Sequence, residues 1–139
     1  MYDLPMLGIS DSLKAMQVML EEALKDPERP VSIAIVDSQG LTIQFARMDQ
    51  CRLLPQQLAY KKAYTAAVMR SDTLAVAERF KSMGRSISEM GDHNLVGVQG
   101  GIAIQRPGDG AFLGAIGVSG LAAEEDEALA RLGLQAMQL

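Results

Sequence analysis

The sequence predicts an α+β fold in which helices cover an antiparallel sheet of about five strands. Short apolar runs are joined in pairs by turn sequences, as in β-hairpins, and no helical crossover between parallel strands is visible. Segments with apolar residues at three- and four-residue steps lie before, between and after these pairs. The expected order is α-ββ-αα-β(β)β-α, which is typical of an antiparallel sheet packed against helices.

The composition limits the possible functions. With 139 residues and 48% hydrophobic content, the chain is expected to form a single domain over residues 1–139. A net charge of −4 without a basic cluster argues against a nucleic-acid partner. A single cysteine excludes an intrachain disulfide, and no apolar run approaches the roughly 18 residues of a membrane span. We therefore expect a cytoplasmic protein with no membrane partner.

The N-terminal third is predicted to form a helix and a hairpin. Apolar residues recur with helical spacing from Ser10, the expected N-cap, until Pro27 prevents the helix from continuing. Residues 31–36 form a β-branched run, which ends in turn chemistry at residues 37–40. Apolar and polar residues then alternate over residues 41–48, as in a strand with one buried face.

Two helices are predicted in the middle of the chain. A loop at residues 49–54 leads into the first of them, and Pro55 lies where an opening helical turn tolerates proline. Alanines on one side of residues 58–69 would let this helix lie close to a neighbour. Residues 71–73 offer a new N-cap for a third, short helix that Gly84 ends.

The remaining strands and the last helix are predicted near the C-terminus. Residues 95–98 are expected to add a short strand, and residues 102–105 and 111–119 to form a hairpin around a turn rich in glycine. The closing helix begins near Ala123 and carries acidic residues in its first turn, where negative charge suits the helix dipole.

The stretch from Gly114 to Gly120 has glycine at every third position and leads directly into the last helix. Glycine inside a strand often marks the close approach of another backbone. Ser119 and Gly120 also stand just before a helix start, where free N–H groups can hold an anion. The stretch is interpreted either as a ligand-binding corner or as a surface on which the final helix packs.

Several motifs together resemble the GlcG/HbpS-like family. They extend from about Val31 to the C-terminus: V-D-x-x-G at 36–40, R-M-D at 47–49, A-x-x-K-A-Y-T-A at 59–66, G-G-I-A-I at 100–104, G-A-I-G-V-S-G at 114–120 and E-x-D-E at 124–127. The same domain is similar to the C-terminal module of PduO-type corrinoid adenosyltransferases. One departure is that the family's usual Asp-Gly-Ala is here Asp-Gln-Cys, at residues 49–51.

The resemblance implies a profilin-like domain that assembles into homo-oligomers. It also implies haem binding, with haem degradation in some members. Many relatives are encoded among genes for glycolate, diol or aromatic catabolism, so small-molecule catabolism is an alternative setting.

His93 is the only imidazole and therefore the candidate axial ligand if a haem is bound. The alternative is a solvated loop histidine without a ligand. Cys51 has no Cys or His partner at zinc-type spacing, so no free metal site is predicted.

Arg47, Asp49 and Lys62 are candidates for holding a carboxylate, such as a haem propionate or a small organic acid. The alternative is an ordinary ion pair at the end of a strand. Asp49 and Asp126 are candidate proton-transfer groups, although acidic residues in a first helical turn generally serve the dipole. The full candidate ligand-binding set is Arg47, Asp49, Lys62, Gly100, Gly101, Gly117, Ser119 and Gly120.

Two classes of function follow. The favoured one is a protein that binds haem or another tetrapyrrole, with Arg47 and Lys62 for its propionates. The alternative is an enzyme, or an accessory subunit of an enzyme, that acts on a small carboxylate or hydroxy acid. The expected partners are a small-molecule or tetrapyrrole ligand and further copies of the chain.

Overall fold

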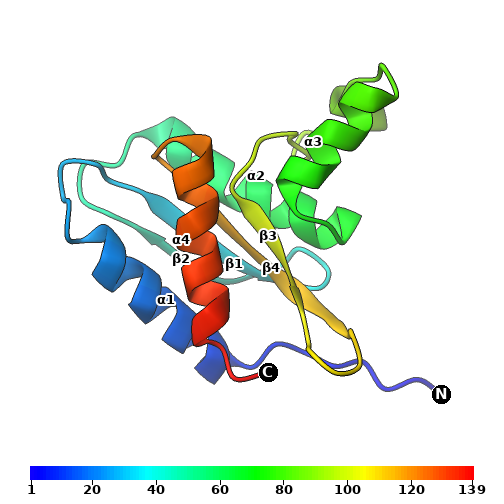
Figure 1. Cartoon of the computed structure of the whole chain (residues 1–139), viewed down its shortest axis with the longest axis horizontal. Helices are drawn as coiled ribbons and strands as arrows, with labels where there is room; N and C mark the ends of the chain where they lie inside the picture. Colours follow the sequence, from blue (N-terminus) through cyan, green and yellow to red (C-terminus); the bar gives the residue numbers. More distant parts are fainter.

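The computed structural model describes residues 1–139 and contains a four-stranded antiparallel sheet with helices on both faces (Figure 1). The elements are α1 (Ile9–Ala23), β1 (Ser32–Asp37), β2 (Thr42–Arg47), α2 (Leu53–Met69), α3 (Thr73–Ser82), the short 3₁₀ helix η1 (Ile87–Met90), β3 (Gly101–Gln105), β4 (Phe112–Ser119) and α4 (Ala123–Ala136). The strand order is β2-β1-β4-β3, and every neighbouring pair is antiparallel. The predicted α+β class with its two hairpins is therefore confirmed.

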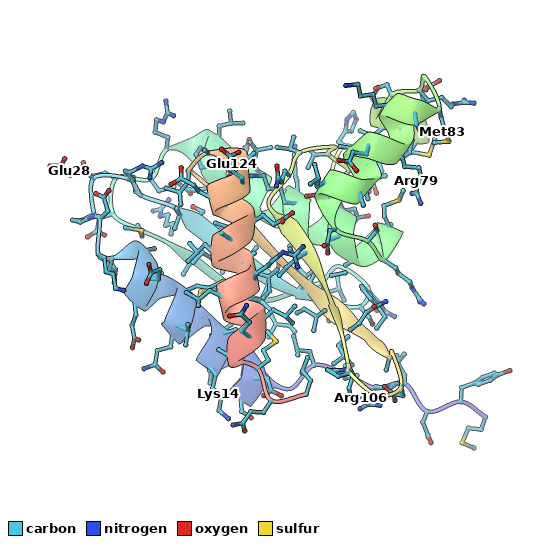
Figure 2. All side chains as sticks on the ribbon, viewed as in Figure 1. Lys14, Glu28, Arg79, Met83, Arg106 and Glu124 are labelled. Atoms are coloured by element: carbon cyan, nitrogen blue, oxygen red, sulfur yellow. The ribbon has the colours of Figure 1, made fainter.

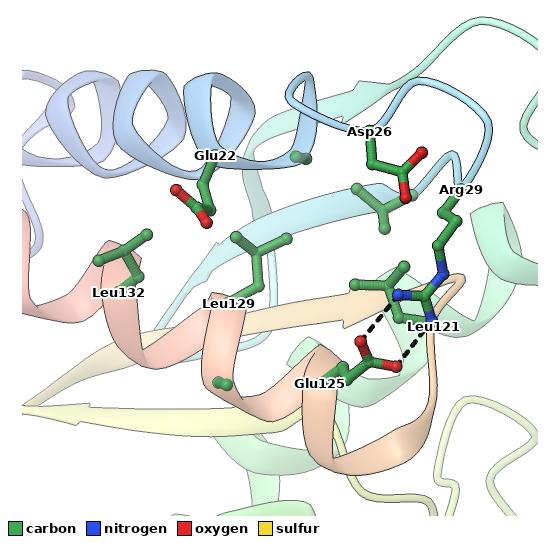
Figure 3. A pocket seen from close by; sticks show the side chains of 10 residues that line it. Glu22, Asp26, Arg29, Leu121, Glu125, Leu129 and Leu132 are labelled. Atoms are coloured by element: carbon green, nitrogen blue, oxygen red, sulfur yellow. Dashed lines mark hydrogen bonds and ion pairs between the residues drawn. The ribbon is translucent and has the colours of Figure 1, made fainter.

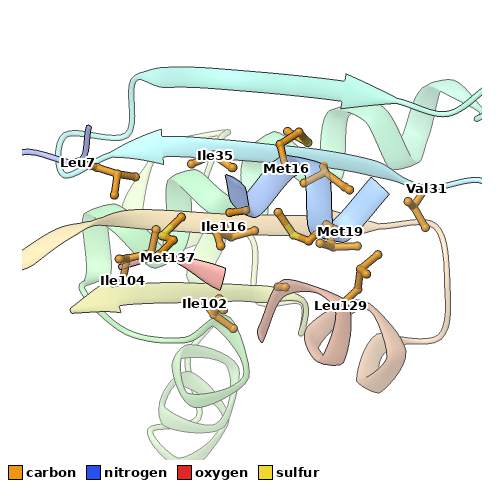
Figure 4. Close-up of a cluster of buried hydrophobic side chains, with 14 of the residues drawn as sticks. Leu7, Met16, Met19, Val31, Ile35, Ile102, Ile104, Ile116, Leu129 and Met137 are labelled. Atoms are coloured by element: carbon orange, nitrogen blue, oxygen red, sulfur yellow. The ribbon is translucent and has the colours of Figure 1, made fainter. Parts of the chain in front are cut away.

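One face of the sheet carries the larger hydrophobic core, which α1 and α4 cover (Figure 4). Ile33 and Ile35 of β1 project to this face and are fully buried, together with Met19 of α1. Full burial of such a side chain contributes roughly 1.5–3 kcal/mol to folding. The helical spacing in α1 and α4 thus places their apolar sides on the sheet, and this layer holds the fold together.

The other face of the sheet is lined by small residues, and α2 lies against it. The alternation along β1 points Ala34 to this face, where it packs with the alanines of α2. Gly117 has no side chain because a Cβ there would collide with the Ala59 carbonyl of α2. The alanine side of the helix was predicted correctly, but the helix that packs on this glycine is α2 rather than the final helix.

The predicted fifth strand, residues 95–98, does not form, and the sheet has four strands. The outer edge of β3 is already occupied: the Gly101 N–H donates to Thr73 Oγ1 at 2.9 Å, and the Ala103 N–H donates to Asp72 Oδ1 at 2.9 Å. The Val96 N–H donates instead to Thr65 Oγ1 on α2 at 2.9 Å. Because side chains near the start of α3 satisfy this edge, no further strand can pair with β3.

The start of α1 differs from the prediction, and one short helix was not predicted. Helix α1 has Gly8 as its N-cap, so the helix starts before Ser10. The polar segment after α3 contains η1, which begins with a capping box between Ser86 and Glu89.

None of the helices is both long enough and apolar enough to cross a lipid bilayer.

Candidate functional site

The Lys62 ammonium lies inside the protein and links three elements. Its Nζ donates to the Val118 carbonyl of β4 at 2.9 Å and to Asp126 Oδ2 of α4 at 3.0 Å. The side chains are only 2% and 3% exposed. Burial raises the pKa of Asp126 above its usual value, against the opposing effects of the Leu121 N–H and the Lys62 ammonium. The structure brings these two candidates together as an internal ion pair, which leaves the ammonium shielded from solvent.

Three candidate glycines lie next to this ion pair and let α2 approach the sheet closely. Gly100 has φ +127°, and a Cβ there would lie 2.8 Å from Lys62 Nζ. Gly101 and Gly117 are covered by the backbone of α2. These three positions therefore serve the close contact between α2 and the sheet.

Arg47 and Asp49 are exposed and lie apart from Lys62. Arg47 ends the edge strand β2, and β1 separates that strand from β4, which Lys62 contacts. The Arg47 Nη1 donates to Gln56 Oε1 at 2.8 Å. The expected grouping of Arg47, Asp49 and Lys62 around one carboxylate is thus not assembled, because the lysine reaches the centre of the sheet and the arginine stays at its edge.

A different polar group gathers where α2 begins. Arg47, Ser32 and Ser119 face one another in register across β2, β1 and β4, so their side chains share the α2 face. Ser32 Oγ lies 3.1 Å from Cys51 Sγ, and Gln56 Nε2 donates to the Cys51 carbonyl at 3.0 Å. Sequence reasoning missed Ser32 and assigned no site role to Cys51. The alternation of β1 could have revealed this serine. It places Ser32 on the same face of the strand as Ala34 and Val36, the face that α2 covers.

A polar cavity of about 380 Å³ opens beside this group. Apart from two prolines its lining has no apolar side chain, and it consists of Glu28, Arg29, Pro30, Gln50, Arg52, Pro55 and Gly120. Gly120 is the candidate from the glycine-rich stretch that reaches it. The cavity is therefore suited to a small polar ligand.

A second cavity, of about 460 Å³, lies between the end of α1 and the start of α4 (Figure 3). Leucines form its apolar wall, and its rim carries Glu22, Asp26 and Glu125. Arg29 donates to both oxygens of Glu125, at 2.8 and 2.7 Å, and holds the pKa of that carboxyl at about 2. The carboxylates would repel haem propionates, and the lining offers no side chain that ligates haem iron. This cavity does not fit a haem.

His93 is exposed on the loop after η1, and this loop is anchored to α2. Tyr64 Oη donates to Asp92 Oδ2 at 2.6 Å, and the Asn94 N–H donates to Asp92 Oδ1 at 2.9 Å. The hydrogen bond lowers the pKa of Asp92 and raises that of Tyr64. No group of three or more His, Cys, Asp or Glu side chains is placed to hold a metal ion. The imidazole is thus accessible on a fixed loop, away from both cavities.

Comparison with known proteins gives one family. The sequence model of a family described as "Haem degrading protein HbpS-like" matches residues 7–135. The corrinoid adenosyltransferase PduO of Salmonella typhimurium is 31% identical over 113 residues, which are 79% of this chain but only 33% of that protein. The protein GlcG of Escherichia coli is 34% identical over 99 residues, 71% of this chain and 70% of that one. A crystal structure of a PduOC:heme complex superposes with a TM-score of 0.86 at 28% identity, covering 96% of each chain.

Proposed function

We propose, from the premise that this chain belongs to the HbpS-like family, that it binds haem or a closely related tetrapyrrole. The observation that supports this most directly is the likeness to the PduOC:heme complex over nearly the whole of both chains. The chain spans about a third of the PduO adenosyltransferase, so the activity of that longer protein is not carried over.

His93 is proposed as the axial ligand. It is the only histidine, its ring is exposed, and its loop is fixed to α2 through Asp92 and Tyr64. Neutral imidazole is a common ligand of haem iron. A bound haem would supply the iron, and this chain would hold the imidazole nitrogen of His93 in position to ligate it.

The haem would lie on an exposed surface and not in a cavity of the single chain. The polar cavity offers a porphyrin only two prolines as apolar lining, and the larger cavity has an acidic rim. Exposed apolar side chains precede the His93 loop: Met83 directly follows α3, and Met90 ends η1. We propose that this surface is shared between copies of the chain in a homo-oligomer.

Titration of the purified protein with haem tests the assignment. The wild-type protein is expected to give a saturable shift of the Soret band with a fixed stoichiometry. His93→Ala should abolish the low-spin spectrum, because the axial nitrogen is lost. Circular dichroism of the variant would verify that the fold is retained.

Cys51→Ser is the matched control, since the thiol is another potential iron ligand. It is expected to keep the wild-type spectrum. An unchanged Soret spectrum in His93→Ala would refute the ligand assignment. No saturable shift in the wild-type protein would refute haem binding itself.

A further inference from the structure

We propose that the cavity between the end of α1 and the start of α4 binds a small primary amine with an aliphatic chain. The cavity has a volume of about 460 Å³, and six of the ten residues that line it are apolar. A volume of this size and a mostly apolar lining with a few polar groups are typical of small-molecule sites. His93 is not among the lining residues, so this site is separate from the proposed haem ligand.

The cavity exists because two small residues line the space between the helices. Helices α1 and α4 touch at Gly133, where an added Cβ would lie 2.6 Å from Met19 Sδ. Closer to the end of α1, Ala23 and Ala128 line the cavity. Their methyl groups leave open the space that longer side chains would fill.

The deepest part of the cavity is apolar. Val31 is fully buried and Leu129 is only 6% exposed, and Leu121 and Leu132 complete the wall (Figure 3). None of these side chains offers a hydrogen bond, so water in this part has few partners. A hydrocarbon chain that displaces the water also removes apolar surface from solvent. The wall therefore favours an alkyl group.

The rim of the cavity carries an excess of negative charge. Glu22, Asp26 and Glu125 are among the lining residues, and Arg29 is the one cation among them. Both terminal nitrogens of Arg29 donate to Glu125, so its charge is already engaged. The Glu22 partner, Lys25, lies outside the lining and is 73% exposed. The lining as a whole therefore attracts a cation.

Asp26 is the carboxylate of this rim that forms no salt bridge. Figure 3 shows the Glu22 and Asp26 carboxylates directed into the space between α1 and α4. An ammonium group brings three donors to such acceptors. A primary alkylamine keeps this charge at pH 7, as a lysine side chain does. We therefore place the ammonium of the ligand at Asp26 and its alkyl chain over Leu129.

Three probes with the same hydrocarbon chain separate charge from apolar contact: hexylamine, 1-hexanol and hexanoate. Each is titrated into ¹⁵N-labelled full-length protein without haem. Hexylamine should shift the Leu121, Ala128 and Leu129 amide signals saturably. Hexanol should bind several-fold more weakly, and hexanoate more weakly still, because the rim repels its charge. Absence of saturable shifts with hexylamine, or equal affinity for hexanol or hexanoate, would overturn the proposal.

Asp26→Asn tests the place of the ammonium. It should weaken hexylamine binding roughly two- to fivefold, the usual effect of losing an exposed ion pair, and leave hexanol binding unchanged. Glu78→Gln is the matched control, because it removes an exposed carboxylate without a salt bridge from α3. It should leave all three titrations unchanged. Wild-type affinity for hexylamine in Asp26→Asn would refute recognition of the charge at this rim.

Ala23→Leu tests the place of the alkyl chain, since the larger side chain would fill the cavity. It should weaken the binding of both hexylamine and hexanol, with the spread of amide signals verifying that the fold is retained. Wild-type affinity in this variant would show that the probes bind elsewhere. Asp26 is exposed, so Asp26→Asn tests the site even if Ala23→Leu fails to fold. Because no haem is present, a failure of haem binding leaves these results intact.

Discussion

At the residue scale, Gln50 shows how one position of the sequence conflicts with its local conformation. It lies in the turn between β2 and α2, closed by the Cys51 N–H on the Met48 carbonyl at 3.1 Å, and has φ +67°. A side chain in this left-handed region costs roughly 1–2 kcal/mol, and glycine adopts it without that cost. The family that the chain resembles usually has glycine here, which agrees with the observed geometry.

Gln50→Gly should therefore raise the free energy of unfolding by about 1 kcal/mol, net of the greater chain entropy of glycine. Urea denaturation of both proteins measures the difference. Gln57→Gly, at an exposed position inside α2, is the opposite control and should lower stability by about 1 kcal/mol. A loss of stability in Gln50→Gly would indicate that contacts of the glutamine side chain hold the turn.

At the scale of elements, the buried pair of Lys62 and Asp126 joins α2 to α4 across β4. The pair has two further partners: the Val118 carbonyl of β4 accepts from the ammonium, and the Leu121 N–H of the β4–α4 loop donates to the carboxylate. Such a pair contributes less than its Coulomb attraction suggests, because both charges lose their hydration. Breaking it from one side is nevertheless expensive, since the remaining charge stays buried.

Lys62→Met should lower the free energy of unfolding by roughly 3–5 kcal/mol, because Asp126 would lose its counter-charge. Lys61→Met, one residue earlier on a less buried side of α2, should change it by less than about 0.5 kcal/mol. In a double-mutant cycle by urea denaturation, adding Asp126→Asn to Lys62→Met should restore part of the loss. Strictly additive effects of the two substitutions would show that the pair is not coupled.

At the scale of the whole molecule, α3 and η1 stand out from the body formed by the sheet, α1 and α4 (Figure 1). Leu74, Met83 and Met90 are exposed on this projecting part, although they are apolar. Figure 2 shows Met83 directed away from the rest of the molecule. Apolar side chains exposed on a projecting segment favour contact with another protein surface, and we propose further copies of the chain as the partner.

Met83→Glu is accordingly expected to weaken self-association by roughly tenfold or more, because a charge would have to be buried at the contact. Light scattering during size-exclusion chromatography at several concentrations measures the mass. Leu24→Glu, an exposed leucine at the end of α1, is the control and should keep the wild-type mass. A wild-type mass for Met83→Glu would exclude the projecting part as the contact.

The sequence by itself determined the features that depend on neighbouring residues. The helical spacing of α1, the β-branched run of β1, the alternation in β2, the alanines of α2 and the turn residues predicted the α+β class, both hairpins and the helix positions. The order of the motifs also identified the family. These predictions succeeded because helix and strand periods and turn chemistry are local properties of the chain.

The tertiary structure alone decided how distant residues meet. It closed the β3 edge with Asp72 and so limited the sheet to four strands, and it buried Lys62 against Asp126. It also placed Ser119 opposite Ser32 on neighbouring strands. Such contacts depend on strand register and on how closely a helix lies on the sheet, and no local pattern in the sequence encodes either distance.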